Sequence, residues 1–379
     1  MKLNNLKFID GLLSLLVKSL PINGKFLSGK PKNILFIKLS AMGDVLCLLP
    51  SIRLLSEAFP DAKISLLTTR RSQPSLFNDI SFINKIYVLP TSLFKIIVFF
   101  PRFFYALLKF DLVIDCDQYY QISELVSYFG RVSIGFKTAI KGASFSISLP
   151  YDSRENEKIQ FKRIAELIVA KFYGVPGAFS VECPELLSKF TPSDKLKKLA
   201  SHLELTGLPT IVIFPGSSAN ASFRRWDLEK YIYIIKKINP YANFMIVGGP
   251  DEVELKPSLN ISGLSAIDFI NEWTLLELLW ILRNVANLFV GNDGGVLHLA
   301  ESQGVPIVGI FGPALYSKWG SINPESIPIE AEIDCRPCLR NFEGVVPSSC
   351  HRGDVACLGM IDQEVVANAI FKKIGVTNA

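Results

Sequence analysis

The sequence lacks a long uninterrupted run of apolar residues, although the chain as a whole is apolar in composition. Its 379 residues are 49% hydrophobic and 20% charged, and the mean hydropathy is +0.31. A membrane-spanning helix needs roughly 18 or more predominantly apolar residues. The longest charge-free stretch, residues 205–223, contains Pro209 and Pro215 and has the pattern of a strand followed by a loop. We therefore expect no transmembrane helix, and the composition excludes a disordered or collagen-like chain.

Two nucleotide-binding signatures are also missing. No Walker A sequence is present, and the glycine-rich turns lack the G-x-G-x-x-G spacing. Nucleoside triphosphate hydrolysis and hydride transfer therefore have no direct support.

Acids are scarce at the N-terminus, where residues 1–33 hold six lysines and a single acid, Asp10. The remaining residues carry 34 basic and 34 acidic side chains, so the net charge of +5 lies entirely in this arm. A nucleic-acid-binding protein would carry its excess on a folded face, so we expect no nucleic-acid partner. A neutral body with a basic, apolar arm fits an anionic membrane surface better.

The arm, residues 1–32, has the periodicity of an amphipathic helix. Its polar residues recur at spacings of three and four: Asn4, Lys7, Gly11, Ser14 and Lys18. Charges interrupt its apolar stretch and no small-residue cleavage site follows, so a signal peptide is not expected. The pattern leaves open whether the apolar face meets lipid, the protein's own body or another subunit.

From residue 33 onwards, short apolar strands alternate with helical stretches, which predicts mostly parallel sheets with helices on both faces. Strands are expected at 33–38, 63–68, 85–89, 111–116 and 132–136, and again at 210–214, 243–247, 288–291 and 306–311. We therefore predict two Rossmann-like halves, residues 33–187 and 206–379, joined by a polar linker at 188–205. Ligands of such sheets bind beyond the carboxyl ends of the strands.

One stretch, residues 92–110, contains seven aromatic residues, three cations and no acid. We expect Pro101 to split it. A core helix would bury Lys95, Arg102 and Lys109 at awkward positions. At a membrane interface, by contrast, aromatic rings lie at the headgroup level and cations extend outward, and we favour this interpretation over a core helix.

The first motif that could carry chemistry is Ser40-Ala41-Met42-Gly43-Asp44, between a strand and a helix. Small residues at such a turn let backbone N–H groups approach a ligand. The acid is either a helix cap or a general base, and spacing alone favours the cap. Lys38, at the strand end, is placed to orient it.

Two further motifs follow strands of the second half and suit a phosphate-bearing ligand. The loop FPGSS, residues 214–218, precedes Arg224 and Arg225, and hydroxyl and guanidinium donors of this kind bind phosphates. The turn GNDGG, residues 291–295, lets amides approach a diphosphate at the start of a helix that carries His298. The alternatives are solvated arginines, a capping aspartate and a packed histidine.

Together these segments resemble glycosyltransferase family 9, the heptosyltransferase-like group. The resemblance rests on ILFIKLSAMGDVLCLLPSIRLLSEAFPDAKI, FPGSSANASFRRW, VGGPDE and LFVGNDGGVLHLAESQGVPIVGIFGP, in that order. It runs from about residue 33 to 370 and leaves the arm outside. It implies a GT-B fold, in which two Rossmann-like domains face a cleft, and an inverting, metal-independent transfer. The C-terminal domain would hold the donor and the N-terminal domain the acceptor.

The same resemblance assigns roles to residues. Asp44 would deprotonate the acceptor hydroxyl that attacks the anomeric carbon. The donor would be bound by Ser217, Arg224, Arg225, Glu252, Asp293, Gly294, Gly295 and His298. Gly294 stands where the family usually has Thr or Ser, so one hydroxyl donor to the phosphates is missing. On the acceptor side we place Lys38 and, by position and charge, Arg70 and Arg71, which would hold an anionic acceptor.

Four of the seven cysteines cluster in residues 335–357, as Cys335-x2-Cys338-x11-Cys350-x6-Cys357. This spacing is typical of a metal knuckle, and a cytosolic protein favours metal over disulfides. Four reduced thiols are the alternative. Comparable clusters occur in part of the family, including autotransporter heptosyltransferases, so a bound zinc or iron ion would have a structural role.

We therefore predict an inverting glycosyltransferase that moves a heptose or related sugar from a nucleotide-diphosphate sugar, ADP-heptose in the first instance, to a lipopolysaccharide core acceptor. It would need no cofactor for catalysis. It would work in the cytoplasm, peripherally at the inner membrane, on a lipid-linked oligosaccharide at an anionic membrane surface. The alternatives are a transferase that modifies protein serines and a nucleotide-binding scaffold without turnover. Asp44 argues against the scaffold.

Overall fold

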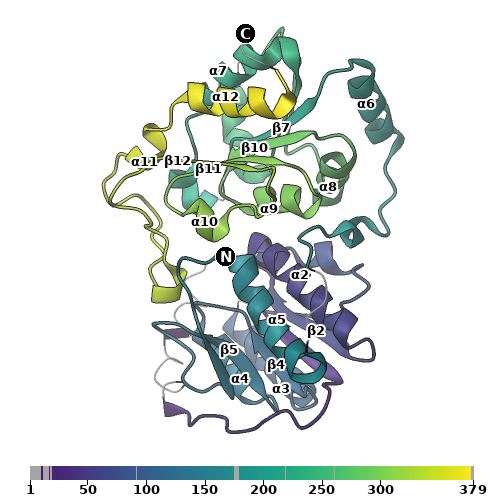
Figure 1. Cartoon of the computed structure of the whole chain (residues 1–379), viewed down its shortest axis with the longest axis vertical. Helices are drawn as coiled ribbons and strands as arrows, with labels where there is room; N and C mark the ends of the chain where they lie inside the picture. The colour runs from purple at the N-terminus through teal and green to yellow at the C-terminus, as the bar shows by residue number, and fades with distance from the viewer. Residues whose placement is uncertain are drawn as a thin grey trace. The chain divides into compact units, whose positions relative to one another are not determined.

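The computed structural model shows an α/β protein with two parallel six-stranded sheets (Figure 1). It describes residues 10–11, 17, 19–90, 92–174, 179–217, 219–259 and 261–376. The chain forms two compact units, which we call the N-terminal unit (residues 1–180 and 340–345) and the C-terminal unit (residues 181–339 and 346–379). The predicted α/β fold with two Rossmann-like parts is confirmed.

The sheet of the N-terminal unit has the strand order β3-β2-β1-β4-β5-β6. Its strands are β1 Asn33–Ile37, β2 Lys63–Thr69, β3 Lys85–Leu89, β4 Leu112–Asp115, β5 Ser133–Lys137 and β6 Ile147–Pro150. All neighbours are parallel, and Ile34 of β1 lies opposite both Ile64 and Leu112. The central strands are mostly apolar because helices cover both faces of a parallel sheet.

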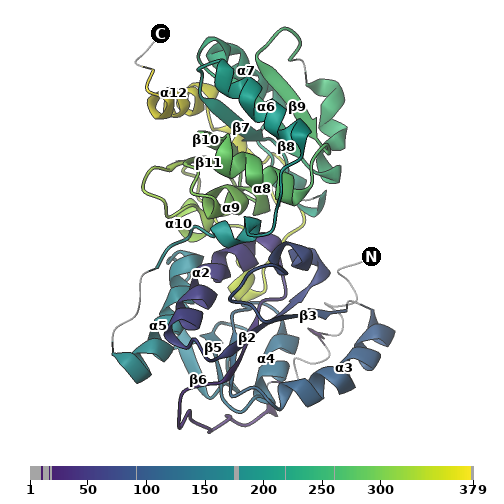
Figure 2. The same cartoon turned by 90° about the vertical axis from the view of Figure 1, so that its right-hand side faces the viewer.

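The helical elements of this unit are α2 Met42–Ala58, η1 Arg70–Ser72, η2 Pro74–Phe77, α3 Leu93–Leu107, α4 Gln121–Tyr128, α5 Glu157–Tyr173 and η7 Asn341–Glu343. Helices α2 and α5 pack together on one side of the sheet, and α3 and α4 lie on the other (Figure 2). The predicted break at Pro101 is wrong, because α3 runs through this residue as one helix.

The sheet of the C-terminal unit has the order β12-β11-β10-β7-β8-β9. Its strands are β7 Thr210–Phe214, β8 Asn243–Gly248, β9 Ala266–Ile270, β10 Leu288–Asn292, β11 Ile307–Phe311 and β12 Ile327–Glu330. Strands β10, β7 and β8 are adjacent, so their carboxyl ends meet at one edge of the sheet. This edge is where the predicted donor motifs begin.

The helical elements of the C-terminal unit are η3 Pro184–Leu187, α6 Asp194–Leu205, η4 Ala219–Arg224, α7 Leu228–Ile238, η5 Asn239–Tyr241, η6 Pro250–Ser258, α8 Leu275–Asn284, α9 Gly295–Ser302, α10 Tyr316–Trp319, α11 Ala356–Gly359 and α12 Gln363–Ile374. Figure 1 shows α7 and α12 on one side of the sheet and α8, α9 and α10 on the other. Helix α6 fills most of the stretch expected to be a polar linker. None of the described helices is both long and apolar enough to cross a membrane.

The described part of the arm packs against the N-terminal unit. The buried Asp10 carboxylate accepts a hydrogen bond from the Ile122 amide, 2.9 Å away, at the start of α4. Asn23 donates to the carbonyls of Tyr128 and Gly130, both at 3.3 Å. At these positions the arm therefore contacts the protein's own body. This is one of the three partners that the periodicity left open, the others being lipid and another subunit. Most of the predicted amphipathic helix lies outside the described residues.

Candidate active site

Asp44 lies in the first turn of α2, directly beyond the carboxyl end of β1. One oxygen of its carboxylate accepts a hydrogen bond from the Ala41 amide at 2.8 Å, so the acid does help to cap the helix. The other oxygen is 3.0 Å from the Lys38 ammonium, and the Asp44 side chain is 19% exposed. The capping role is therefore observed, and the general-base role stays a prediction that the geometry allows, because a carboxylate held on two sides still presents an edge to solvent. Such a group can accept a proton from a nearby hydroxyl.

Lys38 is buried, with 2% of its side chain exposed. Besides Asp44, its ammonium group contacts other polar side chains of the protein. It donates to Oε1 of Gln118 at 2.6 Å and lies 4.0 Å from the Asp117 carboxylate. Burial alone would lower the pKa of Lys38, but the carboxylates of Asp44, Asp117 and Glu157 outweigh it and hold the pKa above its usual value. A permanently charged lysine here fixes Asp44, while its assignment to acceptor binding remains a prediction.

Four residues missed by the sequence analysis extend this buried network: Asp117, Gln118, Tyr151 and Glu157. Gln118 donates to Glu157, which also accepts from the Tyr151 hydroxyl at 2.8 Å. The Asp117 carboxylate accepts from the Leu39 amide at 3.1 Å, which ties the segment after β4 to the segment after β1. The tripeptide Asp115-Cys116-Asp117 at a strand end was the available signal for Asp117, whereas Tyr151 and Glu157 lie far along the chain from it.

Behind this network lies a second buried pair. The Lys141 ammonium donates to the Asp115 carboxylate at 2.8 Å and to the Asp117 carbonyl at 2.7 Å. Burial raises the pKa of Asp115 from 3.8 to about 6, and the nearby lysine only partly opposes this. The pKa of Asp117 is lowered despite its burial, because the charges of Lys38 and Lys141 both favour its ionised form.

Arg70 and Arg71 form η1 immediately after β2, and both are exposed. The Thr69 hydroxyl donates to the Leu39 carbonyl at 2.7 Å, which joins this strand end to the segment before Asp44. Burial raises the pKa of Tyr120 on the same edge, and the Arg71 charge partly offsets the rise. The two arginines thus lie at the edge that carries Asp44, free to meet an anion there.

In the C-terminal unit, the loop after β7 is bound to the segment after β8 by Glu252. This buried carboxylate accepts from the Ser217 amide at 3.1 Å and from the Gly249 amide at 2.8 Å. Burial raises its pKa, although these two amides and Arg225 oppose the rise. A Cβ on Gly216 would lie 2.2 Å from the Glu252 side chain, so glycine is required there. Ser217 and Glu252 are therefore brought together, as the donor-site hypothesis needs.

The two adjacent arginines of this loop have different surroundings. Arg225 donates to the Ser217 hydroxyl at 3.2 Å and to the Asp251 carbonyl at 3.0 Å, and it pairs with Glu254. Arg224, by contrast, lies 3.5 Å from the Asp293 carboxylate. The Nε atom of Arg224 and one oxygen of Asp293 are buried without a hydrogen-bond partner among the described residues. Arg225 therefore stabilises the loop, and the Arg224–Asp293 pair retains unused hydrogen-bonding capacity.

Asn292, which the sequence analysis missed, joins these segments at the end of β10. Its amide group donates to the carbonyls of Pro215 and Gly216, at 2.9 and 3.0 Å, and its oxygen accepts from the Trp226 amide at 3.1 Å. Asp293 and Gly294 follow, and α9 begins at Gly295 without a side-chain cap. Its first amides can therefore bind an anion, as helix N-termini do.

Two residues around α9 bear on the donor prediction. A Cβ on Gly294 would meet no heavy atom closer than 3.8 Å, so space does not require glycine in place of a hydroxyl residue. His298 is buried in α9, and its Nδ1 is 3.9 Å from the Glu301 carboxylate one turn further on. This is the environment of a packed helix histidine, and its donor-binding role remains a prediction.

The four clustered cysteines were predicted to bind a structural metal ion. Among the residues that the structure describes, no three His, Cys, Asp or Glu side chains are arranged to hold a metal ion. Cys335, Cys338, Cys350 and Cys357 are free thiols, and the Cys338 thiol donates to the Cys335 carbonyl at 3.2 Å. The four side chains would have to move closer together to hold a metal, so the metal site stays a prediction and we derive no chemical step from it.

Comparison with known proteins places these features in a family. A sequence model described as "Glycosyltransferase family 9 (heptosyltransferase)" matches residues 106–345, more than half of the chain. Lipopolysaccharide heptosyltransferase 3 of Escherichia coli is 22% identical over 295 residues, which cover 73% of this chain and 82% of that protein.

Two solved structures share the fold. A glycosyl transferase family 9 protein from Veillonella parvula DSM 2008 has a TM-score of 0.69 and 17% identity, covering 91% of this chain and 98% of the other. ADP-heptose lps heptosyltransferase II of E. coli has a TM-score of 0.64 and 16% identity, covering 90% and 98%.

Two Rossmann-like units, each with polar side chains gathered at the carboxyl edge of its sheet, match the GT-B fold of these solved structures. The chain belongs to glycosyltransferase family 9. It is a glycosyltransferase, and the scaffold alternative is set aside.

Proposed function

We propose that the enzyme transfers a heptose from ADP-heptose to a lipopolysaccharide core acceptor. The names of the relatives support this donor and acceptor. The observation that carries the proposal is Asp44, a carboxylate held by a buried lysine and open to solvent at the carboxyl edge of β1. Arg70 and Arg71 lie at the same edge and would bind a phosphorylated core sugar.

In the proposed reaction, the acceptor hydroxyl attacks the anomeric carbon of the donor sugar as Asp44 takes its proton. The new C–O bond forms on the face opposite the diphosphate. The old C–O bond breaks, and ADP leaves with the bonding electrons, so the anomeric configuration inverts. The diphosphate would be bound by Arg224, Asp293 and the first amides of α9. The Glu252 carboxylate would accept a further hydrogen bond from the nucleoside.

Asp44→Asn tests the base. We expect transfer to fall by about 100-fold or more, because general-base catalysis contributes that much, while ADP affinity stays the same. Glu57→Gln, an exposed change on the same helix, is the matched control and should leave transfer intact. Retained transfer in Asp44→Asn would disprove the assignment.

The acceptor and its location need a separate experiment. We propose a lipid-linked acceptor at an anionic membrane surface, with the enzyme peripheral at the cytoplasmic face of the inner membrane. A donor screen by mass spectrometry, with isolated lipid A–core in one arm and a candidate adhesin in the other, distinguishes this from protein modification. Sugar transfer to the adhesin alone would favour the alternative.

We also propose a structural zinc or iron ion at the four cysteines, supported by the type and spacing of the ligands. The side chains would have to rearrange to bind it. Metal analysis of the purified protein, with a Cys335→Ser/Cys338→Ser double variant as control, tests this. Equal metal content in both proteins would count against it.

A further inference from the structure

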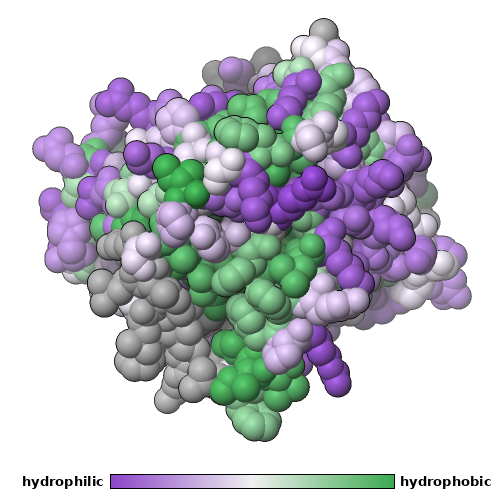
Figure 3. All heavy atoms as spheres, turned by 90° about the horizontal axis from the view of Figure 1, so that it is seen from below, coloured by the Kyte–Doolittle hydropathy of each residue, from purple (hydrophilic) through white to green (hydrophobic). Residues whose placement is uncertain are grey.

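Helix α3 presents large apolar side chains to solvent on the N-terminal unit. Phe94 is 75% exposed, Ile97 62% and Tyr105 67%. Val98 and Leu108 are also more than half exposed. Figure 3 shows one face of the molecule, on which apolar surface gathers in a band with hydrophilic side chains above it and to its right. A surface of this kind normally marks an interaction site rather than bulk solvent contact.

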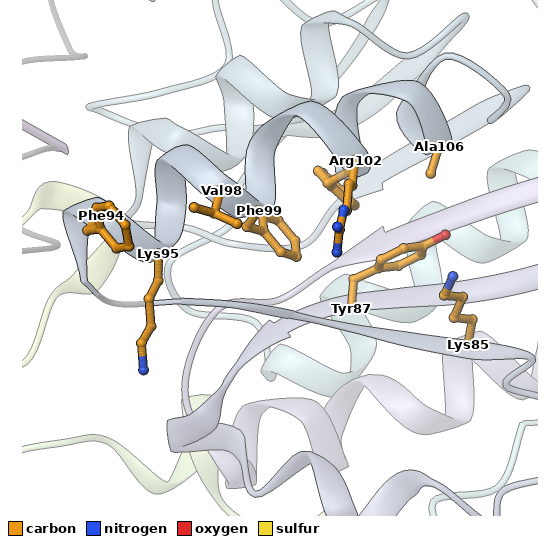
Figure 4. A pocket seen from close by; sticks show the side chains of 9 residues that line it. Lys85, Tyr87, Phe94, Lys95, Val98, Phe99, Arg102 and Ala106 are labelled. Carbon is orange, nitrogen blue, oxygen red and sulfur yellow. The ribbon is translucent and has the colours of Figure 1, made fainter.

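A cavity of about 390 Å³ lies between this helix and edge strand β3. Its lining is mostly apolar and includes Tyr87 from β3 and Phe99 from α3. Lys95, Phe99 and Arg102 follow helical spacing, and Figure 4 shows them extending from the same side of α3. The cavity is therefore an apolar pocket with cations at its margin, Lys85 among them.

The charges of this face are of one sign. Residues 92–110 contain three cations and no acid, and Lys85 of β3 adds a fourth. Within the described part of the chain, none of these four cations forms an ion pair with a carboxylate. Lys109 instead lies over the Tyr105 ring, 4.2 Å from its centre, and Lys85 lies 4.7 Å from the centre of the Tyr87 ring. The cations are thus positioned beside aromatic surface and available to a negatively charged partner.

We infer that α3 and the adjoining pocket dock on a leaflet of anionic phospholipid. Acyl chains would cover Phe94 and Ile97 and enter the pocket, and lipid phosphates would meet Lys85, Lys95 and Arg102. Apolar surface with a one-signed cationic margin matches this occupant, because a bilayer offers hydrocarbon directly beneath a layer of negative charge. The inference rests on the proposed membrane location and adds the surface responsible for it.

Flotation with vesicles that contain neither acceptor nor donor tests this independently of transfer. Vesicles of phosphatidylcholine mixed with phosphatidylglycerol should bind the full chain more tightly than phosphatidylcholine alone. Phe94→Ser/Ile97→Ser should abolish most binding to both. Lys95→Glu/Arg102→Glu should weaken binding to the anionic vesicles by about tenfold or more and remove the lipid preference.

Matched controls come from the C-terminal unit, where Leu205 is 86% exposed and Lys198 is exposed on the same helix. Leu205→Ser and Lys198→Glu should bind as the unaltered protein does. Thermal denaturation checks that each variant is folded. As a second measurement, Phe94→Trp adds an indole to the four native ones, all in the C-terminal unit, and brominated acyl chains should quench the added fluorescence.

Unchanged vesicle binding in both α3 double variants would overturn the inference, and so would equal losses in the controls. Light scattering tests the alternative that this face binds a second copy of the chain. If the apolar variant lowers the oligomeric mass but binds vesicles normally, the face is a subunit interface and the lipid assignment is wrong. Loss of vesicle binding with unchanged mass supports it. If the enzyme binds vesicles through α3 yet transfers no heptose, only the proposed function fails.

Discussion

At the scale of single residues, Arg224 and Arg225 are adjacent but should respond differently to substitution. Arg224→Ala should weaken ADP binding by about tenfold or more, because it removes a charged hydrogen-bond donor with unused capacity. Arg225→Ala should instead lower the free energy of unfolding by about 2 kcal/mol, because its bonds to Ser217 and Asp251 are lost. Calorimetric titration and thermal denaturation measure the two effects. The opposite pattern would exchange the two roles.

Asp115 should make stability depend on pH. Its pKa is about 6 in the folded protein and 3.8 ordinarily, so the folded state binds the proton more tightly. The free energy of unfolding therefore falls as the pH rises from about 4 to about 6, by about 3 kcal/mol from this group. The lowered pKa of Asp117 has the opposite effect, because the stability that this group contributes is lost as the pH falls. That loss occurs below its ordinary pKa of 3.8, outside the pH range in which Asp115 titrates.

Denaturant unfolding at several pH values checks this. Asp115→Asn should flatten the slope between about pH 4 and about pH 6, since it removes the titrating group. The exposed Asp61→Asn should not. An unchanged slope in the Asp115 variant would show that another group titrates there.

The sequence revealed those site residues whose partners lie close to them in the chain. Lys38 and Asp44 share one strand–turn–helix segment, so their proximity could be predicted from spacing. Asp117 and Glu157 reach Lys38 only because β4 pairs with β1 and α5 packs on α2. No local pattern encodes these pairings, because they depend on the order of strands in the sheet.

At the scale of secondary-structure elements, Asp10 supplies the cap that α4 lacks. The residue before this helix, Tyr120, makes no side-chain cap bond, and the Asp10 carboxylate binds the Ile122 amide from a distant part of the chain. Asp10→Ala should therefore destabilise the first turn by about 1 kcal/mol, whereas Asp10→Asn keeps an acceptor oxygen and should recover most of the loss. Hydrogen exchange at Ile122 measures the difference. Unchanged exchange in the alanine variant would rule out capping.

The strands that sequence reasoning missed are all at sheet edges. They are β6, β9 and β12. Interior parallel strands are buried on both faces and appear as continuous apolar runs, whereas edge strands are partly solvated and tolerate proline. Pro150 and Pro328 stand within two of the three. Edge strand β3 was predicted with its observed bounds because three β-branched or aromatic residues follow one another in it, Ile86, Tyr87 and Val88.

At the scale of the whole molecule, the two-part organisation could be predicted because the strand pattern restarts after residue 205. The return of residues 340–345 to the N-terminal unit could not. One contact of this segment is made by the Phe342 ring, whose centre lies 5.3 Å from that of Tyr151. A half-buried aromatic contact of this kind leaves no periodic signal in the sequence.

Phe342→Ala should loosen the N-terminal unit specifically. Loss of the aromatic pair should lower the free energy of unfolding by about 1 kcal/mol. The change should also loosen Tyr151 and its hydrogen bond to Glu157. Hydrogen exchange should rise at β5, β6 and the start of α5 and remain unchanged in the C-terminal sheet. Val346→Ala, an exposed change just outside the returning segment, is the control. Equal effects in both units would contradict a local contact.

This returning segment has a consequence for the order of synthesis. Domains generally fold as they leave the ribosome, the N-terminal one first. Here the first unit emerges by residue 180 without its last piece, because residues 340–345 are translated only after most of the second unit. Tyr151 therefore lacks its ring partner until Phe342, 191 residues later in the chain, has been translated. The N-terminal unit is begun first but completed only at residue 345, and a chain released before that residue would lack a finished copy of either unit.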